Sequence, residues 1–137
     1  MPEDADTAKG IVLDTSILIE LLRSNPAVQT GLDTLMDKRY AVTTSTACVA
    51  ELYAGLCPGE ETDTAQLISI LDCLPLTTEI AIRAGSIKAS RAKTGRTHGI
   101  VDMMIAATAL EFGYAVATSN TRDFDIPELE LIDLTRA

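Results

Sequence analysis

The sequence predicts an α/β fold in which a central parallel sheet of four to five strands is covered by helices on both faces. Short apolar, β-branched runs alternate along the chain with segments of helical character, and strands separated by helices pair in parallel through right-handed crossovers. The length of 137 residues, 47% of them hydrophobic, fits one domain with a substantial core. We expect one domain over residues 10–137, preceded by a flexible acidic tail over residues 1–9.

The amino-terminal part of the chain predicts two strands, each followed by a helix. Gly10–Leu13 is apolar and β-branched, as in a buried strand, and the apolar-rich segment Ile17–Leu22 has helical character. A second short strand is expected over Tyr40–Thr43. The hydroxyls of Thr44-Ser45 can cap a helix, which we place over residues 46–56, before a Pro-Gly pair.

The middle of the chain predicts two helices and a short strand. Apolar positions favour a helix over residues 62–72. A proline limits the strand over residues 74–76, so we place this strand at the periphery of the sheet. A long helix is expected over residues 77–93, followed by a polar loop over residues 94–99.

The last part of the chain predicts one helix and two strands. Asp102 is expected to start a helix over residues 103–112, which Gly113 ends in the left-handed conformation that glycine tolerates. Two strands, over residues 114–118 and 129–134, then complete the sheet.

Charge and residue usage restrict the possible chemistry. A net charge of −9 opposes a general nucleic-acid-binding surface, although bound divalent cations would invert the sign locally. One histidine and three cysteines, without a Cys-x-x-Cys pair, make a zinc site or a histidine-based catalytic centre hard to build. Carboxylates must therefore carry any catalysis. Without a secretion signal or a stretch near the roughly 20 apolar residues of a membrane span, we expect a cytoplasmic protein that does not enter a membrane.

Four acidic residues fall where the predicted topology converges. Asp14 follows the first strand directly, at the edge where open α/β sheets bind ligands. Asn120 and Asp123 follow the strand that ends at residue 118, while Glu51 and Asp102 lie on apolar helices that must pack on the sheet. Hard oxygen ligands at one edge suit Mg²⁺ or Mn²⁺, which can bridge to substrate phosphates. A metal-activated water that attacks a phosphodiester is the natural reaction of such a site.

Each of these positions also has an ordinary structural interpretation. Asp14 and Asp102 could cap their helices. Glu51 could occupy a solvated stripe, although its nearly apolar helix favours a buried carboxylate that needs a partner. Asn120 and Asp123 are common turn residues. The residues alone leave both interpretations open.

Four segments stand in the order and spacing of a known family. They are Val12-Leu13-Asp14-Thr15-Ser16, Val49-Ala50-Glu51-Leu52, residues 99–109 and residues 118–124. Together they resemble the PIN-domain ribonucleases, most closely the VapC-type toxins of bacterial toxin–antitoxin pairs, over residues 11–134. The resemblance implies a three-layer α/β/α fold and endonucleolytic cleavage of RNA with Mg²⁺ or Mn²⁺. It also implies a homodimer, silenced by a VapB-like antitoxin whose carboxyl-terminal segment enters the active site.

The resemblance assigns the acidic residues position by position. Asp14, Glu51 and Asp102 match the first three acidic positions, which serve as catalytic residues and metal ligands. Family members place the fourth acid at the position of either Asn120 or Asp123. The first of these is an amide here, so we assign the fourth ligand to Asp123 and expect Asn120 to orient a water or a ligand.

The resemblance also assigns supporting residues. Thr15, Ser16 and Thr118 match hydroxyl positions that support the carboxylates. Arg96, in the loop before the third acid, is expected to contact an RNA phosphate, because the guanidinium fork suits phosphate oxygens. His98 departs from the apolar or proline residue that the family often has nearby, and we interpret it as a surface loop residue rather than a proton shuttle.

The main alternative is a catalytically degenerate PIN-like module that binds RNA or protein. The amide of Asn120 favours this alternative, and the three matching acids weigh against it. A dehalogenase-like phosphatase would need an acid where Ser16 stands, and a receiver domain would need adjacent acids and a late lysine. We therefore predict a metal-dependent endoribonuclease toxin.

Overall fold

The computed structural model describes residues 9–134 and contains a five-stranded sheet. Every neighbouring pair of strands is parallel, in the order β3-β2-β1-β4-β5. The strands are β1 (Gly10–Leu13), β2 (Ala41–Ser45), β3 (Asp72–Leu74), β4 (Ala115–Ala117) and β5 (Leu131–Ile132). The prediction of a parallel sheet of four to five strands is confirmed.

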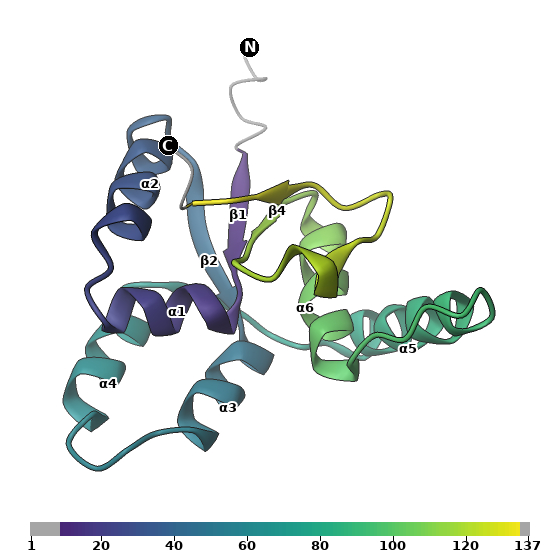
Figure 1. Cartoon of the computed structure of the whole chain (residues 1–137), viewed down its shortest axis with the longest axis horizontal. Coiled ribbons are helices and arrows are strands. Elements are labelled where there is room, and N and C mark those ends of the chain that lie inside the picture. The colour runs from purple at the N-terminus through teal and green to yellow at the C-terminus, as the bar shows by residue number, and fades with distance from the viewer. Residues whose placement is uncertain (1–8, 135–137) are drawn as a thin grey trace.

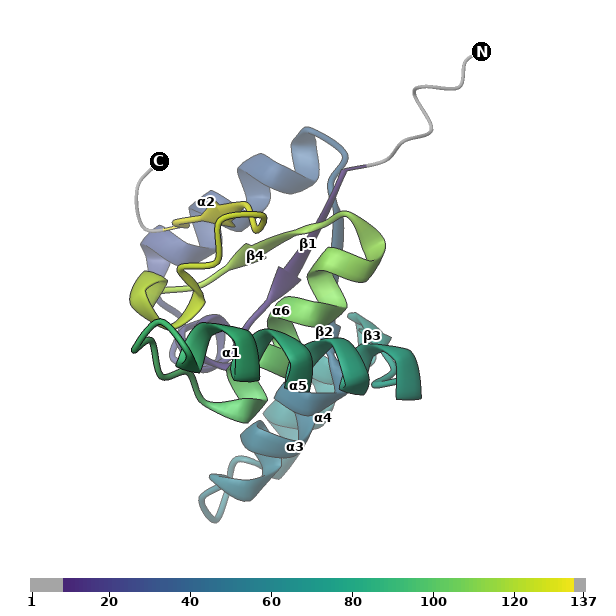
Figure 2. The same ribbon diagram turned by 90° about the vertical axis from the view of Figure 1, so that its right-hand side faces the viewer.

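Helices cover the sheet on both faces and extend beyond one edge. They are α1 (Thr15–Leu22), α2 (Pro26–Asp37), α3 (Thr46–Ala54), α4 (Glu61–Ser69), α5 (Thr78–Ala92), α6 (Ile100–Phe112) and the 3₁₀ helix η2 (Thr121–Phe124). In Figure 1, α1 and α2 lie on one side of the strands and α5 and α6 on the other. The view turned by 90° agrees, with α5 and α6 in front of the sheet and α1 and α2 behind it (Figure 2). The three-layer α/β/α arrangement is confirmed.

The central strand explains why the chain folds around this sheet. Ile11, Val12 and Leu13 are fully buried, because a parallel strand with helices on both faces has no solvent side. The strand pairs with β2 and β4, so its carboxyl end lies beside theirs. In Figure 1 this end of β1 points toward α3, beyond the edge of the sheet. The arrangement brings the carboxyl ends of the central strands next to α1, α3 and α6.

Helix α2 is an element that the sequence interpretation missed. Asn25 caps it, accepting hydrogen bonds from the backbone N–H groups of Ala27 and Val28, and Pro26 occupies its first turn. An Asn-Pro pair before a helical repeat is a recognised start signal. The signal was present in the sequence and was overlooked.

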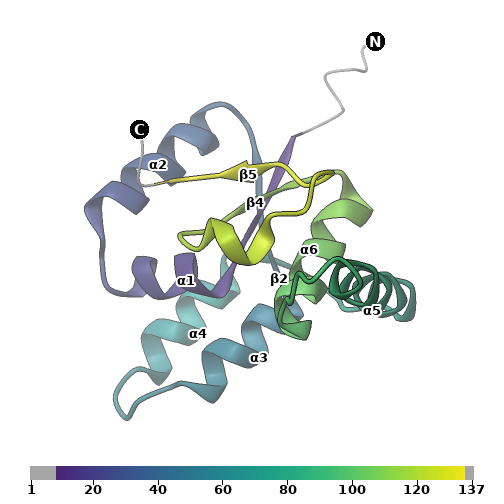
Figure 3. The same cartoon turned by 45° about the vertical axis from the view of Figure 1, so that its right-hand side comes forward.

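Several element boundaries also differ from expectation. Helix α6 begins at Ile100 rather than at Asp102, whereas Gly113 ends it with a φ of 70°, as predicted. Strand β3 ends at Leu74 instead of occupying residues 74–76, but its position at the edge of the sheet is confirmed. Strand β5, at the opposite edge beside β4 (Figure 3), has two residues rather than six.

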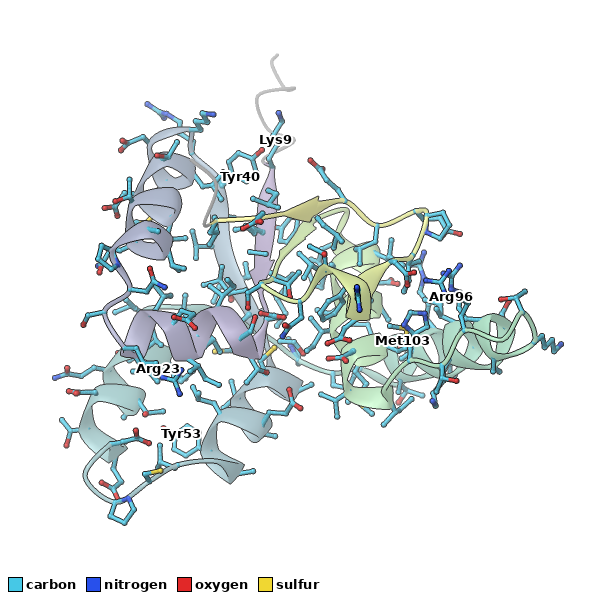
Figure 4. The ribbon with its side chains drawn as sticks, viewed as in Figure 1. Lys9, Arg23, Tyr40, Tyr53, Arg96 and Met103 are labelled. Carbon is cyan, nitrogen blue, oxygen red and sulfur yellow. The ribbon has the colours of Figure 1, made fainter. Side chains whose placement is uncertain are left out.

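The expected acidic tail falls almost wholly outside the described residues. Residues 1–8 and 135–137 are not described, and Lys9 is the first residue that is. The carbonyl of Lys9 accepts a hydrogen bond from the Ala41 N–H at 2.9 Å, and its Nζ lies 6.0 Å from the centre of the Tyr40 ring (Figure 4). Over residues 9–134, none of the helices combines the length and apolar character needed to cross a membrane.

Candidate active site

A cavity of about 250 Å³ lies at the carboxyl ends of β1 and β4, where α1, α3, α6 and η2 meet. The residues that line it are Asp14, Thr15, Ser16, Ile19, Glu51, Asp102, Ile105, Asn120 and Asp123. The structure thus brings together all four predicted acids from four separate elements. A larger hollow of about 360 Å³ beside α5 contains one acid, Glu128, so we place the candidate site at the carboxylate cavity.

Asp14 is a helix cap and a cavity residue at once. Its backbone N–H bonds the carbonyl of Ala117, which places it at the adjoining ends of β1 and β4. Its Oδ1 accepts hydrogen bonds from the Ser16 hydroxyl at 2.6 Å and from the Ile17 N–H at 3.1 Å. These two bonds fix the orientation of the carboxyl group of a residue that is only 4% exposed. The capping interpretation is confirmed, and it does not conflict with the carboxyl group lining the cavity.

Glu51 reaches the same cavity from α3 as an exposed side chain. The expectation that its carboxylate is buried is wrong, because α3 lies beyond the edge of the sheet and leaves this side of the helix open to solvent. The Thr15 hydroxyl donates to Glu51 Oε1 at 2.6 Å. This bond joins α1 to α3 and holds the carboxylate at the cavity.

Asp102 is the third residue of α6 and does not cap it. The N-cap is Gly99, so the capping interpretation of Asp102 is wrong. The pKa of Asp102 is raised from 3.8 to about 6; burial is the largest cause, followed by the negative charges of Asp123, Glu51 and Asp14 in that order. The four carboxylates are therefore close enough to repel one another.

Asp14 has a raised pKa for a related reason. Burial is the largest cause, and hydrogen bonds from Ser16, Thr118 and the Ile17 backbone oppose it. The hydroxyls extend this support to the loop after β4, because Ser16 Oγ accepts from the Ser119 N–H and Thr118 Oγ1 from the Asn120 N–H. The side chains expected to support the carboxylates thus lie in contact with them or with their loop.

The donor set fits a hard divalent cation. Four carboxylates around one cavity repel one another, and a cation would offset the repulsion that raises the pKa of Asp102. Between residues 9 and 134, no three His, Cys, Asp or Glu side chains are arranged closely enough to enclose a metal ion. The carboxylates surround an open space instead, which suits a cation such as Mg²⁺ that keeps several of its waters.

Two residues of the loop before α6 lie outside the cavity lining. Arg96, in the loop after α5, does not line the cavity. Its side chain is half exposed and forms an ion pair with Asp125, in the segment after η2 (Figure 4). His98 is buried, with 4% of its side chain exposed, so its interpretation as a surface residue is wrong. The loop packs under η2, and the ring lies near the Asp123 carbonyl and the Asp125 carboxylate.

The sequence interpretation missed three residues around His98. Lys88 and Arg91 project from α5, and Asp125 follows η2. The spacing of three between Lys88 and Arg91 places them on one face of a helix, but nothing local indicates that this face meets the loop.

Comparison with known proteins agrees with the fold. Residues 11–128 match the PIN domain family. Ribonuclease VapC of Rickettsia bellii is 31% identical over 132 residues, which cover 90% of this chain and 95% of that protein. The tRNA(fMet)-specific endonuclease VapC of Salmonella typhimurium is 31% identical over 133 residues, covering 89% and 96%.

A solved structure shows the same architecture. The crystal structure of DNA-bound VapBC from Salmonella typhimurium superposes with a TM-score of 0.78 at 30% identity, covering 92% of this chain and 98% of that chain. The match to the family extends over most of the sequence, and the sequence relatives and the structural neighbour agree. The chain therefore belongs to the PIN-domain family, among the VapC-type proteins.

Proposed function

We propose that this protein is a Mg²⁺- or Mn²⁺-dependent endoribonuclease and the toxin of a toxin–antitoxin pair. The observation that carries the proposal is the cavity on which Asp14, Glu51, Asp102 and Asp123 converge, with charges close enough to raise the pKa of Asp102. The names of the relatives, a ribonuclease and a tRNA endonuclease, support RNA as the substrate.

The four carboxylates would hold the cation, and the neighbouring side chains prepare them for it. A bound divalent ion supplies an activated water and polarises a phosphoryl oxygen. Ser16 and the Ile17 N–H hold Asp14 in one orientation, and Thr15 holds Glu51. Asp102 has a pKa of about 6, so a small fraction of its carboxyl groups is protonated at neutral pH. A bound cation would cause that fraction to lose its proton.

The open rim of the cavity can admit an RNA strand. Asn120 and Asp123 are exposed on its edge, and an amide offers both a donor and an acceptor to a water or a ribose hydroxyl. The four carboxylates of the cavity repel a phosphodiester, so a bound cation would assist its approach as well as its cleavage.

The partner we propose is a VapB-like antitoxin whose cationic carboxyl-terminal segment occupies this cavity. Structural neighbours at 30% and 25% identity are VapBC complexes, of Salmonella typhimurium and Haemophilus influenzae. An arginine or lysine from such a segment would pair with the carboxylates that otherwise hold the cation. We further propose a homodimer that acts on RNA in the cytoplasm.

A cleavage assay tests the proposal against its alternative. Purified protein should cut RNA with Mg²⁺ or Mn²⁺, and EDTA should stop cleavage. A degenerate PIN-like module, which the amide of Asn120 favours, would bind RNA or its partner without cutting. Absence of cleavage under every metal condition, together with retained RNA or partner binding, would decide for that alternative.

A further inference from the structure

A cluster of polar side chains lies beside the carboxylate cavity without lining it. It joins the carboxyl-terminal half of α5, the loop before α6 and the segment after η2. Its members, which we call the His98 cluster, are Lys88, Arg91, Arg96, His98 and Asp125.

His98 is the centre of this cluster and makes a contact with each of its ring nitrogens. Its Nδ1 lies 3.3 Å from the backbone carbonyl oxygen of Asp123. Its Nε2 lies 3.5 Å from Arg91 Nε, which donates to it, and 3.4 Å from Asp125 Oδ1. A neutral imidazole has one donor and one acceptor nitrogen. Because a backbone carbonyl can only accept, the contact with Asp123 places a proton on Nδ1, which donates to that carbonyl.

The rest of the cluster fixes both chain segments to α5. Arg91 donates to the backbone carbonyl of Asp125 at 2.8 Å, and Arg96 pairs with the carboxylate of the same residue. Lys88 donates to the backbone carbonyl of His98. The loop and the segment after η2 are therefore held on one helix, with the imidazole ring between them.

Asp123 depends on this backbone support more than Asp14 and Glu51 do. Asp14 accepts hydrogen bonds from Ser16 and Ile17, and Glu51 accepts one from Thr15. The hydrogen bonds and ion pairs of residues 9–134 include none that ends on the exposed Asp123 carboxylate. Its place at the cavity is set by the main chain of η2 alone.

The same histidine is tied to the start of the helix that carries Asp102. Gly99, the next residue, caps α6, and its carbonyl accepts from the Met103 N–H. We propose that His98 is a positioning residue, whose Nδ1–H holds η2 so that the Asp123 carboxylate stays opposite Asp102 for cation binding. The inference rests on the proposed function, because it gives His98 a part in the same metal site.

Two substitutions of His98 separate this role from simple packing. In His98→Asn the amide nitrogen can occupy the place of Nδ1 and still donate to Asp123, whereas in His98→Gln it lies nearer the place of Nε2. The affinity for Mn²⁺ is measured by titration calorimetry without RNA. We expect His98→Gln to weaken Mn²⁺ binding about 10- to 100-fold, the usual cost of losing a group that orients a metal ligand. His98→Asn should stay within about 3-fold of wild type, because it retains the donor.

A matched control and a double mutant complete the experiment. Arg83 lies on α5 outside the cluster and forms an exposed ion pair with Glu111 of α6. Arg83→Gln removes this ion pair and should leave Mn²⁺ affinity unchanged. In an Asp123→Ala background, His98→Gln should cause no further loss, because two residues that act through one contact are not additive. Hydrogen exchange of the metal-free protein should be faster at η2 in His98→Gln than in His98→Asn.

The outcomes distinguish this inference from the proposed function. Equal losses in both His98 variants, or a full further loss in the Asp123→Ala background, would overturn the positioning role while the metal site stands. A wild-type protein that binds no Mn²⁺ would overturn the metal site and this inference with it. If circular dichroism shows that His98→Gln does not fold, His98→Leu takes its place, since it fills similar space and removes the Nδ1 donor. Unchanged Mn²⁺ affinity in that variant would equally overturn the proposal.

Discussion

Replacing Asp102 by Asn should abolish metal-dependent cleavage and, at neutral pH, stabilise the metal-free protein. The pKa of Asp102 is raised from 3.8 to about 6 by burial and by the charges of Asp123, Glu51 and Asp14. A raised carboxyl pKa contributes stability below pH 3.8, and that contribution is lost as pH rises through about 6. Asparagine does not titrate, so the stability of the Asp102→Asn variant does not decrease in this way as pH rises.

The magnitude follows from the size of the pKa difference. The interval from 3.8 to about 6 corresponds to about 3 kcal/mol at full value. Asp102 is only partly buried, so solvent screening reduces the expected stabilisation at pH 7 to about 1–2 kcal/mol. In a chain of this length that raises Tm by roughly 3–8 °C.

Urea unfolding of EDTA-treated protein between pH 4 and pH 7 measures this effect. The free energy of unfolding of Asp102→Asn minus that of wild type should be near zero at pH 4 and grow toward pH 7. Asp33→Asn, which removes an exposed carboxylate on α2 away from the cavity, is the control and should show no such growth. Added Mg²⁺ should stabilise wild type more than Asp102→Asn.

Two results would refute the reasoning. A stability difference that does not change between pH 4 and pH 7 would mean that Asp102 does not titrate against its neighbours in the folded protein. Cleavage at the wild-type rate by Asp102→Asn would remove Asp102 from the site.

The remaining predictions concern the fourth ligand, the RNA contact and the partner. Asp123→Ala should weaken Mn²⁺ binding more than Asn120→Ala, and the reverse order in a metal titration would move the ligand role to Asn120. Asn120→Asp should be tolerated and bind Mn²⁺ more tightly, which weaker binding would contradict. Arg96→Ala should weaken RNA binding and reduce its log–log salt slope by about 0.7; an unchanged slope would make Arg96 an ordinary loop charge. Antitoxin binding should weaken in saturating Mn²⁺, and equal affinities by calorimetry with and without the ion would place inhibition elsewhere.

The fold was predictable because its signals are local and repeated. The apolar runs that became β1, β2 and β4 need burial on both faces, and the segments between them have helical character. Helix α2 had an Asn-Pro start signal as well, so its omission was an error of interpretation. The length of β5, in contrast, has no local signal in the sequence. It pairs with β4 over only two residues, and this depends on where the segment after η2 directs the chain.

The positions of the four acids were predictable from topology, but their individual environments were not. Parallel strands end at one edge of a sheet, which places Asp14 and Asp123 together whatever their contacts. Burial depends on neighbouring elements instead. Glu51 is exposed because its helix extends past the sheet, and Asp102 is the third residue of α6 because the backbone becomes helical two residues earlier.

The distribution of charge shows why composition alone describes this site incompletely. A net charge of −9 argues against a surface that binds nucleic acid in general. Yet Arg91 and Arg96 pair with Asp125 after η2, and Lys88 donates to the His98 carbonyl, so three basic side chains accompany one acid in this cluster. Arg96 is half exposed, and its charge therefore reaches solvent on that side. An acidic protein can in this way place basic side chains beside a carboxylate cavity, and only the tertiary contact between α5 and the loop after it brings the two together.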